Sequence, residues 1–316
     1  MELKPSSIET HDVPYRNGAG TSRPTADSVS TGAMRFCSET LGLNDSSFTL
    51  LRDLIHQITG QFFDQSKRDL LADKLSPLVV ERGFTTYLDY YYLLKYDTVA
   101  APTEWERVAD ALSVPETYFW REHDQVQALI DHVVPEHFAR SPGEPLRIWS
   151  AACCTGEEPL TLALALKESG WLDKMQVEIS GSDASPAAIT KARRGIYRER
   201  SFRMLPPELR ARYFSEEGGG WRVDSQLHRR VRFQMANLID PAAVAALANV
   251  HVIFCRNVFI YFSPESIRQT VQRFHQHMVA PGHLFVGAAE SLLKITNDFD
   301  LREVGGAFVY LKREAA

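Results

Sequence analysis

The residues from Leu146 to Pro159 constrain the fold more than any other stretch of this chain. They read LRIWSAACCTGEEP. The first six, Leu146 to Ala151, are mostly apolar and predict a buried strand; small residues follow, and apolar residues recur at helical spacing from Glu157 onward. A strand, a tight turn and a helix in this order belong to an open α/β sheet, in which ligands bind outside the carboxyl ends of the strands. The sequence therefore predicts a small-molecule site at residues 152–158.

Composition excludes several other classes of protein. The 316 residues, 44% of them apolar, suffice for one large domain or two ordinary ones, and a net charge of −5 argues against a broad nucleic-acid surface. We expect no membrane insertion, because no stretch approaches the roughly 18 apolar residues that a span requires. The four cysteines form no C-x-x-C pair and have no metal-ligand spacing with the histidines. This favours a reduced, cytoplasmic chain without a metal site.

The chain divides into three parts by its pattern. Residues 1–47 are rich in Ser, Thr, Pro and Gly and predict a flexible tail. Residues 48–140 show helical periodicity, with Pro77 bending or ending the second helix, and predict a small all-α domain. Residues 141–316 alternate strand and helix and end on a pair of strands. The alternation breaks at about 198–231, which predicts a β-rich insertion.

An acid ends the second predicted strand of the sheet domain. Asp183 ends the predicted strand 177–182, and in a Rossmann-like sheet an acid at this place holds the ribose hydroxyls of a nucleotide. The alternative is that Asp183 caps the next helix. The two readings differ in what Asp183→Ala removes, which is either ligand affinity or about 1 kcal/mol of stability.

The turn after the first strand is a poor pyrophosphate site. It has one glycine, Gly156, instead of G-x-G-x-x-G, and the helix begins with Glu157 and Glu158, whose carboxylates would repel phosphates. These residues suit a cationic nucleoside without phosphate, which describes S-adenosylmethionine. The alternative is that both acids only interact favourably with the helix dipole.

A second notable stretch, SVPETYFWRE, spans 113–122. Its aromatic residues Tyr118, Phe119 and Trp120 are explained by packing between the two domains. Arg121 lies next to them, and a guanidinium flanked by aromatic rings near a domain boundary is a common way to bind a carboxylate.

These motifs together resemble the CheR-type chemotaxis-receptor glutamate methyltransferases. The resemblance covers about residues 48–313 and rests on five ordered matches: TYFWRE (117–122), WSAACCTGEEP (149–159), Asp183 with KARRGIY (191–197), LPPELRARYF (205–214) and FCRNVFIYF (254–262).

The resemblance implies both a fold and an activity. The fold is a Rossmann-like methyltransferase sheet whose last strand is antiparallel, with a small β insertion, preceded by a small all-α domain. The activity is transfer of a methyl group from S-adenosylmethionine to glutamate side chains on the cytoplasmic helical bundle of a methyl-accepting chemoreceptor. The sequence indicates no nucleic-acid partner, and nothing in it requires more than a monomer.

The resemblance also assigns roles to residues at matching positions. From the helical side, Thr117 and Arg121 would reach the cofactor. Glu157 and Asp183 would hold its amino-acid and ribose parts, Asn237 and Leu238 would flank the adenine, Asn257 and Val258 would lie beneath the methionine portion, and Tyr261 would lie near the transferred methyl.

The implied chemistry needs no general base. A glutamate with a pKa of about 4.3 is already ionised at neutral pH, so the enzyme has only to align a carboxylate oxygen with the methyl group. We hypothesise that Arg121 and Tyr261 steer the acceptor carboxylate or close the site. Tyr261 is explained equally well by packing beside Phe259 and Phe262.

The chain departs from the family pattern at several positions. Pro115 replaces an asparagine and Ala288 replaces a histidine, which bears on ligand affinity, and the second helix is less basic than usual. Two alternatives therefore stay open: a catalytically weak or inactive cofactor-binding module that docks to a signalling array, and a methyltransferase with another kind of substrate. The acidic net charge counts against a nucleic-acid substrate.

Overall fold

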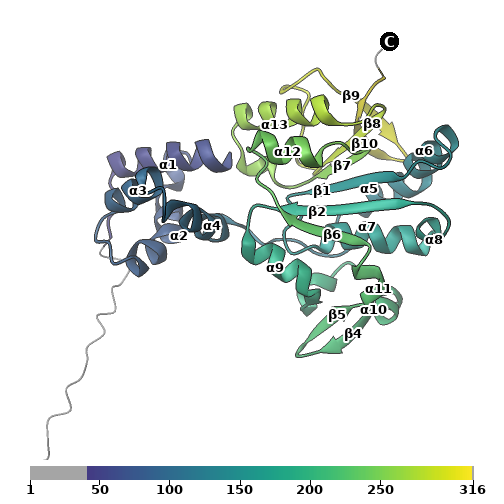
Figure 1. Ribbon diagram of the computed structural model, residues 1–316, viewed down its shortest axis with the longest axis horizontal. Helices are drawn as coiled ribbons and strands as arrows, with labels where there is room; N and C mark the ends of the chain where they lie inside the picture. The colour runs from purple at the N-terminus through teal and green to yellow at the C-terminus, as the bar shows by residue number, and fades with distance from the viewer. Residues whose placement is uncertain (1–40, 315–316) are drawn as a thin grey trace, which may run out of the picture. The chain divides into compact units, whose positions relative to one another are not determined.

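The computed structural model describes residues 41–314 of the chain (Figure 1). Most of the predicted tail lies outside this range, and its last residues already join the helical domain, since Leu43 is buried and the first helix begins at Asp45. The N-terminal part is all-α, as predicted. It consists of α1 (Asp45–Thr59), η2 (Gln65–Lys67), α2 (Arg68–Glu81), α3 (Tyr87–Tyr96) and α4 (Ala101–Leu112).

The helical domain is organised around one apolar core. Apolar faces of its helices meet there, and side-chain caps at Asn44 and Thr86 accept the first free N–H groups of α1 and α3. Helix α2 continues through Pro77 to Glu81. The hydrogen bond that proline removes is offset because Leu75, Leu78 and Val79 are buried in the core on both sides of it.

The second part is built on a seven-stranded sheet with the order β6-β2-β1-β7-β8-β10-β9. The first five of these pair in parallel, and β10 runs antiparallel to both β8 and β9. The predicted fold, including the antiparallel end of the sheet, is therefore confirmed. The strands are β1 (Leu146–Ala151), β2 (Val177–Asp183), β6 (Val231–Met235), β7 (Val252–Cys255), β8 (Gly282–Val286), β9 (Asp300–Val304) and β10 (Ala307–Lys312).

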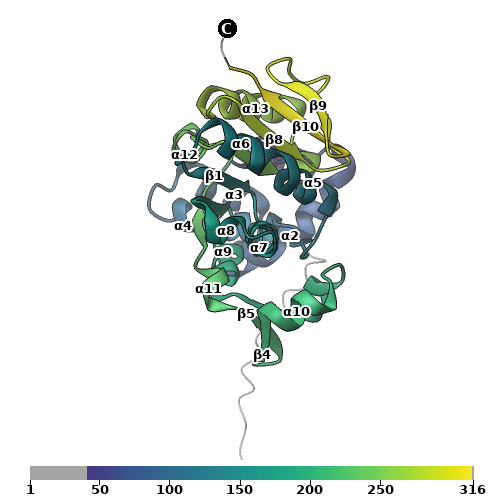
Figure 2. The ribbon, with the colours of Figure 1, turned by 90° about the vertical axis from the view of Figure 1, so that its right-hand side faces the viewer.

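Helices cover both faces of this sheet (Figures 1 and 2). Alternate residues of β1 separate the two cores: Ile148 packs with α7 on one face, whereas Trp149 packs with α13 on the other. The first face is covered by α5 (His123–Ala128), η3 (Leu129–Val133), α6 (Val134–Arg140), α7 (Glu157–Glu168), α8 (Trp171–Lys174) and α9 (Pro186–Arg194), and the second by α12 (Pro241–Leu247) and α13 (Pro264–His277).

The division between the two parts lies earlier than the sequence suggests. We predicted a boundary at 140, but Phe119, Val126, Leu129 and Phe138 belong to the core of the sheet domain. The helical stretch 123–140 therefore covers the sheet, and the helical domain ends with α4 at Leu112. Helical periodicity indicates that a segment is a helix but not which of the two cores it packs against. The boundary was misplaced for this reason.

The insertion after α9 forms a small antiparallel sheet with the order β3-β5-β4. The predicted β-rich insertion also contains a short helix, α11, which Asp224 caps by accepting the N–H groups of Gln226 and Leu227. The elements are β3 (Ile196–Tyr197), η4 (Glu199–Phe202), α10 (Pro207–Tyr213), β4 (Phe214–Glu217), β5 (Gly220–Val223) and α11 (Ser225–His228).

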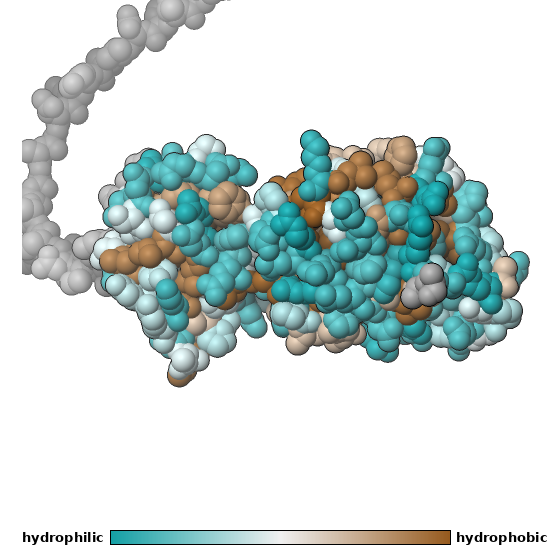
Figure 3. Space-filling view, turned by 90° about the horizontal axis from the view of Figure 1, so that it is seen from above, coloured by the Kyte–Doolittle hydropathy of each residue, from teal (hydrophilic) through white to brown (hydrophobic). Residues whose placement is uncertain are grey.

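The surface of the described residues is mixed in character. Figure 3 shows one face, on which hydrophilic side chains cover most of the area and hydrophobic ones form smaller patches. None of the helices in 41–314 combines the length and the apolarity that crossing a bilayer demands.

Candidate functional site

A cavity of about 430 Å³ lies at the carboxyl ends of the parallel strands, which we call the strand-end cavity. The order of the sheet reverses between β1 and β7, and in open α/β sheets this is where ligands bind. Its floor comes from the loops after β1, β2, β6 and β7, and residues 102–118 at the end of the helical domain line the other side. The site predicted at 152–158 is therefore part of a larger cavity that two domains enclose.

Backbone in unusual conformations gathers around this cavity. Glu122, Ala152, Cys154 and Asn257 all have positive φ, which costs a non-glycine residue free energy. Gly156 has φ +94°, and a Cβ there would come within 3.0 Å of Ala192 and Phe233. The turn before α7 therefore requires glycine for its conformation and for the close approach of its neighbours.

Asp183 lines the cavity at the end of β2, as predicted. Its carboxylate accepts the backbone N–H groups of Cys154 and Ser185, each at 2.9 Å. Burial raises the pKa of Asp183, and these two hydrogen bonds oppose the shift. The helix cap of α9 is Ser185, whose hydroxyl accepts the N–H of Ala188 at 3.0 Å. Asp183 is therefore not needed as the cap.

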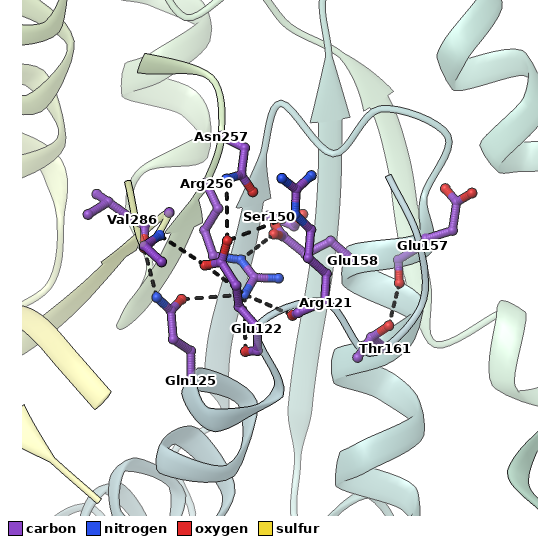
Figure 4. Close-up of polar contacts among 12 residues, drawn as sticks. Arg121, Glu122, Gln125, Ser150, Glu157, Glu158, Thr161, Arg256, Asn257 and Val286 are labelled. Carbon is purple, nitrogen blue, oxygen red and sulfur yellow. Dashed lines mark hydrogen bonds and ion pairs between the residues drawn. The ribbon is translucent and has the colours of Figure 1, made fainter. Parts of the chain in front are cut away.

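The two carboxylates at the start of α7 point in different directions, which corrects one predicted role. Glu157 is buried away from the cavity, where its carboxylate accepts the hydroxyls of Thr155 and Ser201 at 2.6 and 2.9 Å. Glu158 lines the cavity instead, and Figure 4 shows it pointing toward Arg256 while Glu157 points away. Because adjacent helical residues lie about 100° apart, only one of the two can face the strand ends.

A buried guanidinium that the sequence reasoning did not single out joins the loops around the cavity (Figure 4). The side chain of Arg256 is 2% exposed, and its Nε donates to Glu158 Oε2 at 2.7 Å. A second nitrogen donates to the backbone carbonyl of Arg121 at 3.1 Å. Glu158 is also held by the hydroxyl of Ser150 at 2.7 Å. In the sequence, the arginine of the FCRNVFIYF motif (254–262) could have indicated this network.

A second buried acid organises the loops after β7 and β8. Glu290 accepts the backbone N–H groups of Gly287, Asn257 and Ile260 at 2.7, 2.8 and 3.2 Å. Burial raises its pKa, and the backbone hydrogen bonds oppose the shift. Glu290 thereby fixes the start of η5 (Phe259–Tyr261), the short helix that carries Tyr261. Its role was missed because the sequence shows only a glutamate three residues after Gly287, and no pattern indicates which backbone N–H groups it accepts.

The remaining predicted residues are brought together by the fold. Thr117, Arg121, Asn237, Leu238, Asn257, Val258 and Tyr261 all line the strand-end cavity. Arg121 donates to the carbonyl of Glu116 at 2.8 Å, and Asn237 donates to the carbonyl of Ile58 on α1 at 2.6 Å. Pro115 and Ala288, the departures from the family pattern, are not among the lining residues.

The described residues support neither a reactive thiol nor a metal site at this cavity. Burial raises the pKa of the Cys154 thiol to about 12, so this thiol stays protonated at neutral pH. Within 41–314 no three His, Cys, Asp or Glu side chains are arranged to hold a metal ion.

The charges around the cavity match one kind of ligand. Five carboxylates line it against two guanidiniums, and one of these, Arg256, is bound to Glu158: the lining charges are Glu106, Glu116, Arg121, Glu158, Asp183, Asp240 and Arg256. This surplus of negative charge favours a cationic ligand without phosphate. Together with the sheet, the site defines a methyltransferase that uses S-adenosylmethionine.

Two family models match the chain in succession. The CheR methyltransferase all-alpha domain matches residues 46–113, and the CheR methyltransferase SAM binding domain matches residues 115–306. The chain therefore belongs to the CheR methyltransferase family, as its motifs predicted. The two matches also divide the chain where its two cores divide.

Curated relatives extend over most of the chain. Chemotaxis protein methyltransferase 2 of Vibrio cholerae serotype O1 is 34% identical over 273 residues, which cover 85% of this chain and 94% of that protein. Chemotaxis protein methyltransferase 1 of Pseudomonas aeruginosa is 32% identical, covering 84% and 97%. The chemotaxis protein methyltransferase of Escherichia coli is 31% identical, covering 84% and 91%.

Solved structures show a more remote likeness. The magnesium protoporphyrin IX methyltransferase of Synechocystis with bound SAM is 15% identical with a TM-score of 0.32, covering 85% of this chain and 96% of that one.

Proposed function

We propose that this chain transfers a methyl group from S-adenosylmethionine to glutamate side chains of a methyl-accepting chemoreceptor, forming methyl esters. The observation that carries the proposal is the strand-end cavity, rich in carboxylates and without a pyrophosphate loop, in a chain of the CheR family. The relatives named as chemotaxis protein methyltransferases support the receptor as substrate. They do not favour the alternative of an inactive docking module.

Residues of the cavity suit the parts of this cofactor. Asp183 offers a carboxylate at the end of β2 for the ribose hydroxyls, and Glu158 offers one for the ammonium group. Asn237 and Leu238 flank the adenine, and Thr117, Asn257 and Val258 line the methionine side. S-adenosylmethionine supplies a methyl group activated by its sulfonium, so no residue of the chain has to act as a nucleophile.

The acceptor side rests on Arg121 and Tyr261. A guanidinium is suited to hold the carboxylate of the incoming glutamate, which is already ionised. Burial raises the pKa of Tyr261, so its phenol stays protonated and can donate a hydrogen bond. The two side chains act by positioning the acceptor oxygen and excluding water. We propose that the enzyme works in the cytoplasm, as a monomer, on the helical bundle of the receptor.

The activity is tested with the full chain and labelled S-adenosylmethionine. Membranes from cells that overproduce one chemoreceptor serve as acceptor, and label released by mild alkali reports methyl esters. We expect alkali-labile label that is lost when the receptor's acceptor glutamates are replaced by alanine. Binding of S-adenosylhomocysteine without any ester formation on a panel of receptors would instead favour the docking module.

The two acceptor residues make a sharper prediction. Arg121→Ala is expected to lower methyl transfer roughly a hundredfold and Tyr261→Phe roughly tenfold, because each removes a group that positions the acceptor carboxylate. Single-turnover rates at saturating cofactor measure this. Wild-type rates for both variants would remove Arg121 and Tyr261 from the acceptor site.

A further inference from the structure

A cluster of charged and aromatic residues adjoins the acceptor side of the cavity, and one of its members, Arg203, does not line the cavity itself. We call it the arginine cluster; it consists of Glu116, Tyr118, Arg121 and Arg203. The first three line the strand-end cavity. Arg203 follows η4, in the insertion after α9. The cluster therefore joins the helical side of the cavity to the β-rich insertion.

Both guanidiniums of the cluster lie over one aromatic ring. The Cζ of Arg203 is 3.7 Å from the ring centre of Tyr118, and the Cζ of Arg121 is 5.4 Å from it. These are distances at which a cation is attracted to the ring. Because both run to the same centre, the two guanidinium carbons lie within roughly 9 Å of each other, a spacing that two carboxylates one helical turn apart can match.

Glu116 holds both arginines in the free protein. Its carboxylate pairs with Arg203 at 2.5 Å, and its backbone carbonyl accepts from Arg121 at 2.8 Å. The side chains of Arg203 and Glu116 are 41% and 61% exposed. An ion pair this exposed contributes little to stability, so another carboxylate can replace Glu116 at little cost.

We propose that Arg203 is a second binding residue of the acceptor site, which takes a carboxylate next to the glutamate being methylated, and that Glu116 occupies Arg203 until the acceptor displaces it. The proposal deepens the proposed function and rests on it. It assigns the substrate class as an acidic helical segment with two carboxylates about one turn apart. Arg121 then positions the reacting carboxylate, and Arg203 selects its neighbour.

The test compares acceptor affinity with cofactor affinity in the full chain. Arg203→Gln is expected to raise the KM for receptor membranes roughly fivefold, to leave the Kd for S-adenosylhomocysteine at its wild-type value, and to lose most of its effect in about 0.5 M NaCl. Glu116→Gln is expected to lower the KM for the acceptor, because it frees Arg203. Arg212→Gln is the matched control, since Arg212 also forms a surface ion pair, with Glu168 at 2.5 Å, and does not line the cavity.

A change in the acceptor identifies the carboxylate that Arg203 binds. Replacing the acceptor glutamate that lies one helical turn from the methylated one by glutamine should raise the KM of the wild-type enzyme about fivefold and that of the Arg203→Gln enzyme much less. The inference is overturned if Arg203→Gln keeps the wild-type KM, or if it weakens S-adenosylhomocysteine binding as much as acceptor binding. A wild-type enzyme that forms no esters would instead overturn the proposed function itself.

Discussion

Glu157 and Glu158 are adjacent carboxylates in one motif, yet the fold gives them different surroundings. Glu157 is enclosed with two hydroxyls, whereas Glu158 reaches the cavity and pairs with Arg256. The motif indicated that acids begin the helix, and both Glu157 and Glu158 lie in the first turn of α7. Which acid faces the ligand depends on the rotation of α7 about its axis, and that is set by packing against the sheet rather than by the residues themselves.

This difference predicts that two isosteric substitutions have different effects on the binding of S-adenosylhomocysteine. Glu158→Gln is expected to weaken S-adenosylhomocysteine binding roughly tenfold, because it removes a charge that faces the cavity and leaves Arg256 only its longer ion pair with Glu122, at 3.7 Å. Glu157→Gln is expected to leave the Kd unchanged. Calorimetric titration of both variants measures this, and loss of binding in Glu157→Gln alone would restore the role first predicted for Glu157.

The same pair makes a prediction for pH. Burial raises the pKa of Glu157 in the folded chain, so folding favours its protonated form. The stability that this contributes is complete below the pKa of the unfolded chain and is lost as pH rises through the folded pKa. The stability of Glu157→Gln relative to wild type is therefore expected to be higher at pH 8 than at pH 5. Urea unfolding at both pH values tests the sign.

At the scale of whole elements, periodicity predicted most helices and strands but not the irregular segments. The apolar residues of β1 and α7 are enough to predict these two elements, because almost every residue of both is buried. The final pair of strands follows from the apolar residues of β10, three of which are buried. The site depends as much on η5 and the loops that hold it, and these are fixed by single backbone hydrogen bonds to Glu290. The periodicity of apolar residues does not predict hydrogen bonds of this kind.

The packing of these loops predicts the effect of one added methyl group. A Cβ at Gly287 would lie 2.6 Å from the side-chain amide of Asn257 and 2.8 Å from Glu290 Oε2. Gly287→Ala is therefore expected to displace the start of η5 and to lower methyl transfer roughly ten- to a hundredfold, with a loss of stability of about 1–3 kcal/mol. Gly42→Ala is the control, because nothing lies within 4 Å of a Cβ there. Equal rates for both variants would contradict the role of these loops.

At the scale of the whole described structure, the cavity needs both domains, and their docking was beyond sequence reasoning. It depends on a few polar contacts between residues far apart in the chain. Asn237 donates to the carbonyl of Ile58, His56 lies 2.8 Å from the hydroxyl of Ser263, and Ser185 donates to Asp110 at 2.5 Å. Residue types alone do not indicate which polar side chains meet across a domain interface. The motifs that face the cavity could be predicted, because in open α/β sheets ligands bind at the carboxyl ends of the strands.

The contact at Asp110 predicts that a residue outside the cavity controls cofactor binding. Asp110 lies on α4, which packs against α9, and its carboxylate accepts both the hydroxyl of Ser185 and the N–H of Ala187 at the start of α9. Because Trp105 and Ala109 of the same helix line the cavity, loosening α4 moves part of its wall. Asp110→Ala is therefore expected to weaken S-adenosylhomocysteine binding roughly fivefold, and Asp110→Asn, which keeps an acceptor oxygen, much less.

A control variant in the insertion separates this effect on binding from a general loss of stability. Asp224→Ala also removes a carboxylate that accepts two hydrogen bonds at a helix start, here from two N–H groups, but in the insertion and not at the domain interface. We expect it to lower stability by about 1 kcal/mol, as Asp110→Ala does, while the Kd stays at its wild-type value. If the two alanine variants bind S-adenosylhomocysteine equally, the wall formed by α4 does not depend on Asp110. If only Asp110→Ala is impaired, the helical domain holds the cavity in shape from outside it.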